Sequence, residues 1–245
     1  NYSPGDDFRA LDWRVYGRTE KLLVRLFEEK EDLMIYFLID CSRSMQFSEE
    51  AKLNYAKQMA AALGYIGLCN QDHVSFISFN EKVLDRLPPT SGRGQIFKVF
   101  NFLEKLKSDG GTSFEDAFKT FAGENRRRGV AVVISDFYNP NGYEKALNFL
   151  HYQQFETYVV HVVDDREFDL KVHGDVSLVD EETGEQVDVT MTPGLMSKYR
   201  KAFEELCLKM EAYCVARRML YFRTPVSTPF DEIVLKVFRA GGFLK

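Results

Sequence analysis

The chain has 245 residues, of which 45% are hydrophobic and 28% are charged, and its net charge at pH 7 is −5. A chain of this length and composition buries a large core without disulfide bonds. The acidic balance argues against a nucleic-acid-binding protein, and no apolar run reaches the length of a transmembrane helix. We therefore expect no nucleic-acid partner and no membrane contact from this segment.

From residue 33 onward, short apolar runs alternate with segments whose apolar residues recur at helical spacing. Continuous apolar runs are typical of strands that are buried on both faces of a parallel sheet. Pro88 and Pro89 follow one run, which predicts an edge strand that ends before them. The expected strands are 33–39, 74–79, 82–87, 130–135, 157–163 and 219–222, and the expected helices are 48–69, 96–106, 113–121, 143–149, 195–213 and 230–238.

Local sequence signals also predict where two of these helices begin. Ser48, followed by Glu49 and Glu50, is expected to cap the first one. Ser113 with Asp116 resembles a capping box at the start of the helix that follows the Gly110-Gly111 loop.

The alternation of strands and helices predicts an α/β fold. We expect a Rossmann-like, doubly wound and mostly parallel sheet with helices on both faces and one antiparallel edge strand. Residues 176–179 and 187–190 flank a turn sequence and predict a β-hairpin insertion near 174–190. Residues 1–30 are expected to form an N-terminal extension that packs on a domain spanning 31–245.

The most informative motif is D-x-S-x-S at Asp40, Ser42 and Ser44, directly after the first expected strand. In an extended chain these three side chains point to one side. Thr112, which follows two glycines, and Asp136, at the end of the strand 130–135, are expected at the same edge of the sheet. One carboxylate and two hydroxyls, completed by Thr112 and Asp136, form an oxygen-only ligand set suited to Mg²⁺, Mn²⁺ or Ca²⁺. Each motif alone is better explained by loops that cap helices, and only their combination favours a metal site.

Other metal and redox sites are not predicted. The four cysteines form no C-x-x-C pair, and the four histidines are scattered, so no zinc site is expected. Buried thiols in a reducing compartment favour a cytoplasmic location.

The five oxygen-bearing residues resemble the metal-ion-dependent adhesion site of von Willebrand factor A domains. The resemblance covers residues from about 31 to 240. It implies that Ser42 and Ser44 are direct ligands, that Thr112 binds directly or through water, and that Asp40 and Asp136 act largely through water. It also implies a protein-interaction module whose open coordination position accepts an Asp or Glu of a partner.

A narrower resemblance involves residues 4–13, Pro-Gly-Asp-Asp-Phe-Arg-Ala-Leu-Asp-Trp, together with Ser135-Asp136-Phe137. These segments are similar to the bacterial family called domain of unknown function number 58. Its members are often encoded beside MoxR-type AAA+ ATPases, which are therefore an expected partner. Many carry two membrane helices before this motif, so we expect a soluble short form or the cytoplasmic piece of a membrane-anchored parent. Without the family, Arg9, Asp12 and Trp13 indicate a packed extension with an ion pair.

The alternative function is a Mg²⁺-dependent phosphohydrolase on the same kind of sheet. Haloacid-dehalogenase-type enzymes need a second Asp two residues after the first, as general acid and base, and here that position is Ser42. Asp164 and Asp165 would add carboxylates after the strand 157–163, but solvation in a loop is the role that we expect for them. No histidine adjoins Ser42 in sequence to activate it as a nucleophile. We therefore expect a binding module and not an enzyme.

Overall fold

The computed structural model describes residues 11–23, 32–125, 127–139, 141–168, 174–179 and 186–240, without the side chains of 47–50, 168, 238 and 240. The chain divides into two compact units, residues 1–32 and residues 33–245. In the first unit, Asp12 caps helix α1 (Trp13–Thr19) by accepting hydrogen bonds from the backbone N–H groups of Arg14 and Val15. The packing of this unit on the domain stays a prediction, and Arg9 lies outside the described residues.

One six-stranded sheet forms the centre of the second unit, in the order β3-β2-β1-β4-β5-β8. Every neighbouring pair is parallel except β2 and β3. The predicted α/β fold, with one antiparallel edge strand, is therefore confirmed. The strands are β1 (Met34–Asp40), β2 (His73–Phe79), β3 (Val83–Thr90), β4 (Val130–Ser135), β5 (Glu156–Val163) and β8 (Leu220–Pro225).

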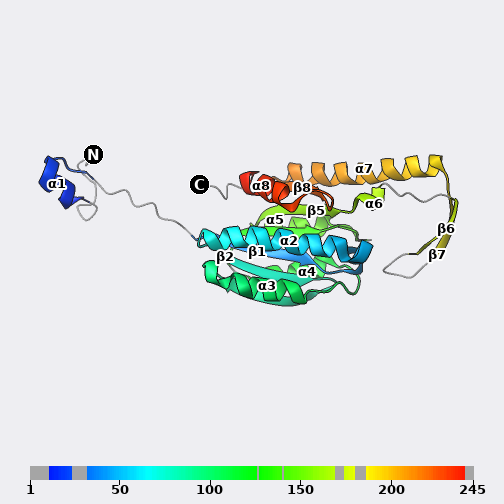
Figure 1. Ribbon diagram of the computed structural model, residues 1–245, viewed down its shortest axis with the longest axis horizontal. Coiled ribbons are helices and arrows are strands. Elements are labelled where there is room, and N and C mark those ends of the chain that lie inside the picture. Colours follow the sequence, from blue (N-terminus) through cyan, green and yellow to red (C-terminus); the bar gives the residue numbers. More distant parts are fainter. Residues whose placement is uncertain are drawn as a thin grey trace. The chain divides into compact units, whose positions relative to one another are not determined.

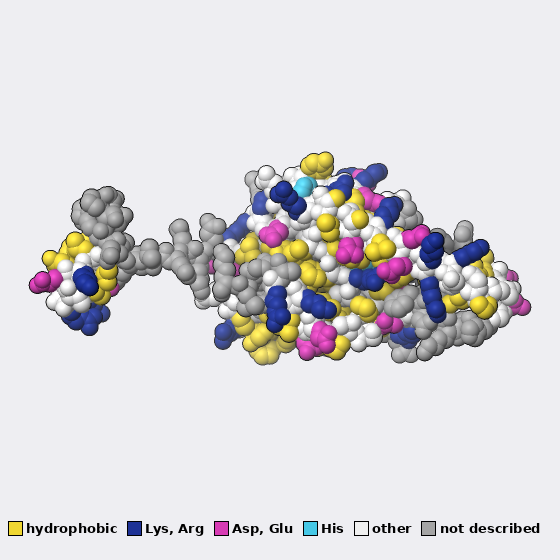
Figure 2. All heavy atoms as spheres, turned by 90° about the horizontal axis from the view of Figure 1, so that it is seen from above, with side chains coloured by type: hydrophobic (Ala, Val, Ile, Leu, Met, Phe, Trp, Pro, Cys, Tyr) yellow, Lys and Arg dark blue, Asp and Glu magenta, His cyan; other side chains and the backbone are white. Residues whose placement is uncertain are grey.

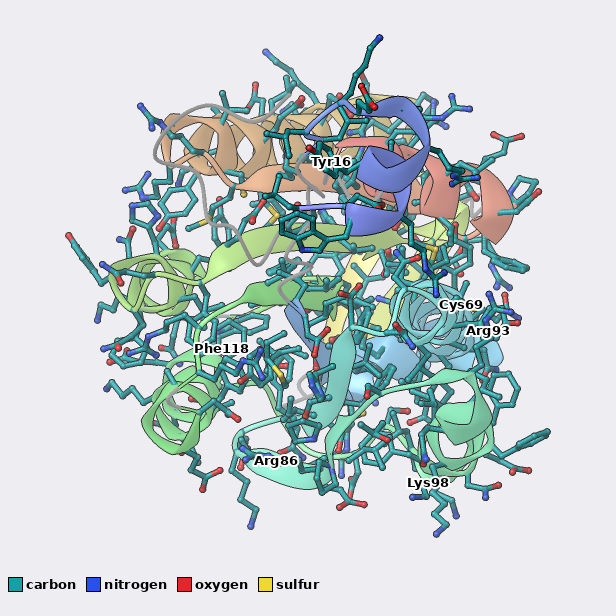
Figure 3. All side chains as sticks on the ribbon, turned by 90° about the vertical axis from the view of Figure 1, so that its left-hand side faces the viewer. Tyr16, Cys69, Arg86, Arg93, Lys98 and Phe118 are labelled. Carbon is teal, nitrogen blue, oxygen red and sulfur yellow. The ribbon has the colours of Figure 1, made fainter. Side chains whose placement is uncertain are left out.

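Helices cover both faces of this sheet (Figure 1). In the end-on view of Figure 3, Cys69 and Lys98 mark the helices on one side, Phe118 marks a helix on the other, and Arg86 lies on the β3 edge. Two separate apolar clusters fill the two interfaces. One cluster joins the sheet to α2 (Phe47–Cys69), α3 (Ile96–Lys105) and α8 (Phe230–Ala240), and the other joins it to α4 (Phe114–Glu124), α5 (Glu144–Tyr152) and α7 (Pro193–Ala216).

Helix α2 lies very close to the sheet because it carries glycine where it crosses β2. A Cβ atom on Gly64 would lie 2.5 Å from the ring of Phe76, and one on Gly67 would lie 2.8 Å from Cγ1 of Val74. This close approach buries the sheet-facing side of α2, including Lys52 near its start.

Two local expectations were wrong, and a third was confirmed only in part. Strand β3 runs through both prolines to Thr90, because an edge strand leaves one side without ladder hydrogen bonds and proline there costs none. Ser48 lies inside α2, which a short 3₁₀ helix, η2 (Arg43–Gln46), precedes. Ser113 is the N-cap of α4, but its hydroxyl donates to the Asp116 carboxylate at 3.1 Å and makes no cap bond to the backbone.

A separate two-stranded antiparallel sheet pairs β6 (Gly174–Val179) with β7 (Gln186–Met191). These are the two strands expected around the turn at 180–185, which itself lies outside the described residues. The remaining elements are the short helices η3 (Arg93–Gln95) and α6 (Asp165–Phe168).

On the face shown in Figure 2, lysine and arginine side chains are interspersed with aspartate and glutamate. Within the described ranges, no helix combines the length and the apolar character needed to cross a membrane.

Candidate metal centre

The candidate centre lies where the parallel strands β1 and β4 end side by side. In their register Ile39 is opposite Ile134, so the next residues, Asp40 and Ser135, are neighbours at the carboxyl edge of the sheet. Both are fully buried. Open α/β sheets bind ligands at this edge, since consecutive loops converge there.

Asp40 faces into the protein and holds the turn that follows β1. Its Oδ1 accepts the backbone N–H of Ser42 at 2.9 Å, and its Oδ2 accepts the hydroxyl of Ser135. Each carboxylate oxygen thus has a donor from the chain. Asp40 therefore fixes the conformation of the D-x-S-x-S loop from the interior of the protein.

Ser42, Ser44 and Asp136 form a continuous chain of oxygens. The hydroxyls of Ser42 and Ser44 lie 3.0 Å apart, and Ser44 Oγ donates to Asp136 Oδ1 at 3.1 Å. Ser42 is buried and Ser44 is half-buried. Two segments that are 92 residues apart in sequence therefore meet through their oxygen atoms.

Backbone hydrogen bonds hold the loop that carries Thr112 beside the D-x-S-x-S loop. The N–H of Arg43 donates to the carbonyl of Gly110 at 3.0 Å, and the N–H of Asp109 donates to the carbonyl of Cys41 at 2.8 Å. Gly110 has φ of +76°, a conformation that side-chain-bearing residues rarely adopt. Thr112 itself is 7% exposed. The structure thus brings the third predicted segment to the same edge of the sheet.

The residue that follows Asp136 at the end of β4 has a left-handed backbone conformation. Phe137 has φ of +56°, which is uncommon for a bulky residue. Its ring is buried and stacks on Phe114 with the ring centroids 5.4 Å apart. Its N–H donates to Ser135 Oγ at 2.8 Å. Core packing therefore enforces the sharp turn that directs Asp136 toward the serines.

Lys52 and Glu167 also belong to this site. Lys52 Nζ lies 2.6 Å from Asp136 Oδ2 and 2.7 Å from Glu167 Oε1. Both the lysine and Asp136 have side chains that are only 1% exposed. Glu167, on α6, also accepts the backbone N–H of Asp164 at 3.1 Å. The ammonium group of Lys52, on α2, therefore bridges Asp136 at the end of β4 and Glu167 after the end of β5.

Burial dominates the electrostatics of these groups. It raises the pKa of Asp40 from 3.8 to about 7, with a further contribution from the negative charge of Asp136. Burial alone would lower the pKa of Lys52, but the charges of Asp136 and Glu167 outweigh it, so the pKa of this lysine is raised. Lys52 is therefore a permanent positive charge inside the site.

The donor chemistry fits a small divalent cation. Octahedral Mg²⁺ has ligands at 2.0–2.1 Å, which places neighbouring ligand oxygens about 2.9 Å apart. The separation of 3.0 Å between the hydroxyls of Ser42 and Ser44 matches one edge of such an octahedron, and Asp136 Oδ1 orients Ser44 by accepting its hydroxyl at 3.1 Å. Three carboxylates and one ammonium group leave this buried cluster with two negative charges when all four groups are ionised, and this net charge attracts a divalent ion. Among the described residues, no three His, Cys, Asp or Glu side chains group together as metal ligands, so the hydroxyls are needed to complete the set.

The additional carboxylates considered after β5 have other partners. Asp164 binds the guanidinium group of Arg166 through both oxygens, and Asp165 accepts the backbone N–H of Ser227 at 3.2 Å. The buried His161 lies 2.7 Å from the hydroxyl of Tyr221 through Nδ1, and burial lowers its pKa to about 4. None of these three groups is engaged with the serine pair.

A polar pocket of about 310 Å³ is lined by residues that closely follow Thr112 and Asp136 in the chain. It is bounded by the first turn of α4, which begins two residues after Thr112, and by the loop from β4 to α5, which begins with Asp136. Its lining residues are Ser113, Glu115, Asp116, Asn139, Asn141, Gly142, Lys145 and Ala146.

Sequence reasoning did not identify Lys52, Glu167 or Ser135 as members of the site. One signal for Lys52 was present, because it stands at helical spacing from Ala56, Met59 and Leu63 and so interrupts an apolar stripe with a charge. A lysine on the buried face of a helix needs an acidic partner. The sequence did not reveal which carboxylates these are.

Comparison with known proteins identifies relatives along most of the chain. A family model described as "Protein of unknown function DUF58" matches residues 1–212. An uncharacterized protein of Mycobacterium tuberculosis, Rv1480, is 28% identical over 206 residues, which are 82% of this chain and 65% of that protein. The uncharacterized protein YeaD of Bacillus subtilis is 39% identical over 49 residues, or 20% of this chain and 12% of that protein. The chain therefore spans about 65% of the length of the mycobacterial relatives.

Similar solved structures include two from Bacteroides. BatB from Bacteroides thetaiotaomicron has a TM-score of 0.51 at 16% identity, covering 86% of this chain and 99% of that one. An aerotolerance-related membrane protein from Bacteroides fragilis has the same score and identity and covers 86% and 100%. A von Willebrand factor type A protein from Catenulispora acidiphila has a TM-score of 0.41 at 17% identity, covering 55% and 34%. The two Bacteroides structures thus share the α/β fold that the sequence predicted.

Proposed function

We propose that this chain, which belongs to the family described as "Protein of unknown function DUF58", is a divalent-metal-dependent protein-interaction module. The observation that carries the proposal is the oxygen chain of Ser42, Ser44 and Asp136, with separations of 3.0 Å and 3.1 Å at the rim of the sheet. Its geometry suits Mg²⁺, with Mn²⁺ or Ca²⁺ as alternatives.

In this proposal each residue has a defined task. Ser42 and Ser44 present neutral hydroxyl oxygens, and Thr112 adds a third from the neighbouring loop. Asp40 fixes the loop through the backbone N–H of Ser42, and Asp136 orients Ser44. A bound Mg²⁺ would supply a hard cationic centre that attracts a carboxylate oxygen. Neutral ligands leave that centre most of its charge, so the natural ligand for an open position is an Asp or Glu of a partner protein.

The surroundings of the site offer further contact surface for such a partner. The polar pocket between α4 and the β4–α5 loop presents amide, hydroxyl and charged side chains beside the candidate centre. We propose a MoxR-type AAA+ ATPase as the partner, as the family resemblance implies. For the parent protein we propose a cytoplasmic site of action and a membrane anchor outside this segment.

We propose binding rather than catalysis as the role of the site. A phosphohydrolase would need a second carboxylate as general acid and base, and Ser42 occupies that position. A generic phosphatase screen tests this alternative. Turnover by the wild type that is lost in Asp40→Asn would replace the binding proposal with the enzymatic one.

Two experiments test the proposed function. Calorimetry with Mg²⁺ and Mn²⁺ should show one site in the wild type and none in a Ser42→Ala/Ser44→Ala variant. Ser75→Ala, a buried serine on β2 that bonds the carbonyl of Leu87, is the matched control and should bind as the wild type does. A pull-down with and without EDTA should then recover an AAA+ ATPase only when Mg²⁺ is present. Equal recovery in both arms would contradict a metal-dependent interaction.

A further inference from the structure

We propose that Lys52 is a positioning residue that sets the charge the candidate centre offers to a metal ion. It does so by holding one oxygen of Asp136 and leaving the other to face the serine pair. This inference rests on the proposed function, because it concerns the same site. Its distinctive consequence is that removing Lys52 and removing its second partner, Glu167, change metal affinity in opposite directions.

The two oxygens of Asp136 have different environments. Oδ2 lies 2.6 Å from Lys52 Nζ, inside the protein. Oδ1 accepts Ser44 Oγ at 3.1 Å and the backbone N–H of Tyr138 at 3.1 Å. The lysine thus fixes the rotation of this carboxylate, so that a single oxygen remains on the side of the hydroxyls.

Glu167 shares the charge of Lys52 with Asp136. Its Oε1 lies 2.7 Å from the same Nζ, and its Oε2 accepts the backbone N–H of Asp164. Lys52 also lies over the ring of Tyr138, 5.1 Å from the centroid. The ammonium group is therefore anchored from α6 and from the residues after β4, and it has little freedom to follow Asp136 alone.

The charge balance decides the expected effect on metal binding. With Lys52 present, the ammonium group offsets part of the negative charge of Asp136. A bound cation therefore keeps more of its own charge for an incoming carboxylate. Without Lys52, both Asp136 and Glu167 are uncompensated and attract a cation more strongly. Without Glu167, the full charge of Lys52 acts on Asp136 and repels a cation. At the effective dielectric constant of proteins, a unit charge within several ångströms of a divalent ion changes its affinity by on the order of tenfold or more.

Calorimetric titration of the metal-free protein with Mg²⁺ tests this inference, with circular dichroism as the check on folding. Lys52→Met should bind Mg²⁺ at least about tenfold more tightly than the wild type, and Glu167→Gln at least about tenfold more weakly. The double variant Lys52→Met/Glu167→Gln removes one charge of each sign and should return to within about threefold of the wild type. Lys236→Met is the matched control, because Lys236 is an exposed lysine of α8, and it should leave the affinity unchanged.

A merely structural role for Lys52 gives a different result, since both single variants would then loosen the site and weaken binding. Weaker binding by Lys52→Met, or unchanged binding by Glu167→Gln, overturns the inference while the proposed function stands. If Lys52→Met does not fold, Glu167→Gln and the double variant decide the question by the loss and the recovery of affinity. Absence of Mg²⁺ binding by the wild type removes both proposals together.

Discussion

Asp40 and Asp136 end neighbouring strands, but their surroundings give them different properties. Asp40 accepts hydrogen bonds from uncharged donors, the N–H of Ser42 and the hydroxyl of Ser135. Asp136 is bound by the ammonium group of Lys52. A buried carboxylate without a cationic partner is costly to ionise.

The stability of the metal-free protein should therefore depend on the titration of Asp40. Its pKa is raised by burial, and by the charge of Asp136, to about 7 in the folded state, from 3.8. The folded state then holds a proton that the unfolded state has lost, so the contribution of this group to stability falls as pH rises from about 4 to 7. In urea denaturation with EDTA, this part of the pH slope should be missing in Asp40→Asn. The control Asp231→Asn, on the exposed side of α8, should keep the wild-type slope. Parallel curves for wild type and Asp40→Asn would contradict the assigned shift.

Lys52 should be among the most sensitive positions for stability. Replacing it with Ala leaves two buried carboxylates without their cation, which typically costs about 3–5 kcal/mol. Urea denaturation in EDTA measures this loss as a lower midpoint at an unchanged slope. Lys119→Ala, which breaks the exposed pair with Glu115 on α4, is the control and should not shift the midpoint. A small effect at Lys52 would mean that water replaces the ammonium group.

At the level of elements, two loops with unusual backbone conformations bring the site together. Phe137 turns the chain after β4 in a left-handed conformation that core packing holds. Gly110 does the same in the Thr112 loop, without a side chain. Backbone hydrogen bonds fix the Thr112 loop to the D-x-S-x-S loop, and the side chains of Ser135 and Asp136 accept backbone N–H groups of the loop after β4. The position of each oxygen therefore depends on loop geometry rather than on the strands alone.

Gly110→Ala should therefore disturb the site more than an ordinary loop substitution. The new Cβ would lie 2.9 Å from Nδ2 of Asn80, and the residue would keep a φ near +76°. We expect a stability loss of about 1–2 kcal/mol and weaker Mg²⁺ binding, measured by thermal unfolding and calorimetry. Gly123→Ala in α4, where no atom lies within 4 Å of the added carbon, should be neutral or slightly stabilising. Equal effects at both glycines would show that the Thr112 loop tolerates rearrangement.

For the whole molecule, the sheet is the frame on which the candidate site is built. Apolar clusters on both faces fix the strands, whereas the buried ionisable groups are concentrated at the carboxyl edge of the sheet. A ligand that binds only the folded state stabilises it in proportion to the logarithm of its concentration.

Mg²⁺ should accordingly raise the unfolding temperature of the domain. At a free concentration of 100 times the dissociation constant, the stabilisation is about 2.7 kcal/mol. Differential scanning calorimetry over a range of Mg²⁺ concentrations measures it. The Ser42→Ala/Ser44→Ala variant should unfold at one temperature throughout the series, as should the wild type in EDTA. A shift that persists in the variant would place the ion elsewhere on the surface.

Much of this molecule was predictable because its signals are local. The continuous apolar runs at β1 and β4 and the helical stripe of α2 each reflect burial that a short segment already encodes. The D-x-S-x-S motif is not extended, as strand periodicity had assumed, because β1 ends at Asp40 and Ser44 lies in the 3₁₀ helix η2. The prediction that Ser48 caps α2 was wrong because α2 starts upstream of this residue, directly after η2. The predicted end of β3 was wrong because proline is tolerated at an edge.

The sequence by itself determined the alternation of strands and helices and the order of the oxygen-bearing segments along the chain. Only the tertiary structure decided that Lys52 from α2 and Glu167 from α6 meet Asp136 beneath these oxygens. The physical reason is that helical periodicity marks Lys52 as a buried charge but does not say which carboxylates it meets. Ion pairs between residues 84 and 115 positions apart depend on how three elements pack rather than on the conformation of any one of them.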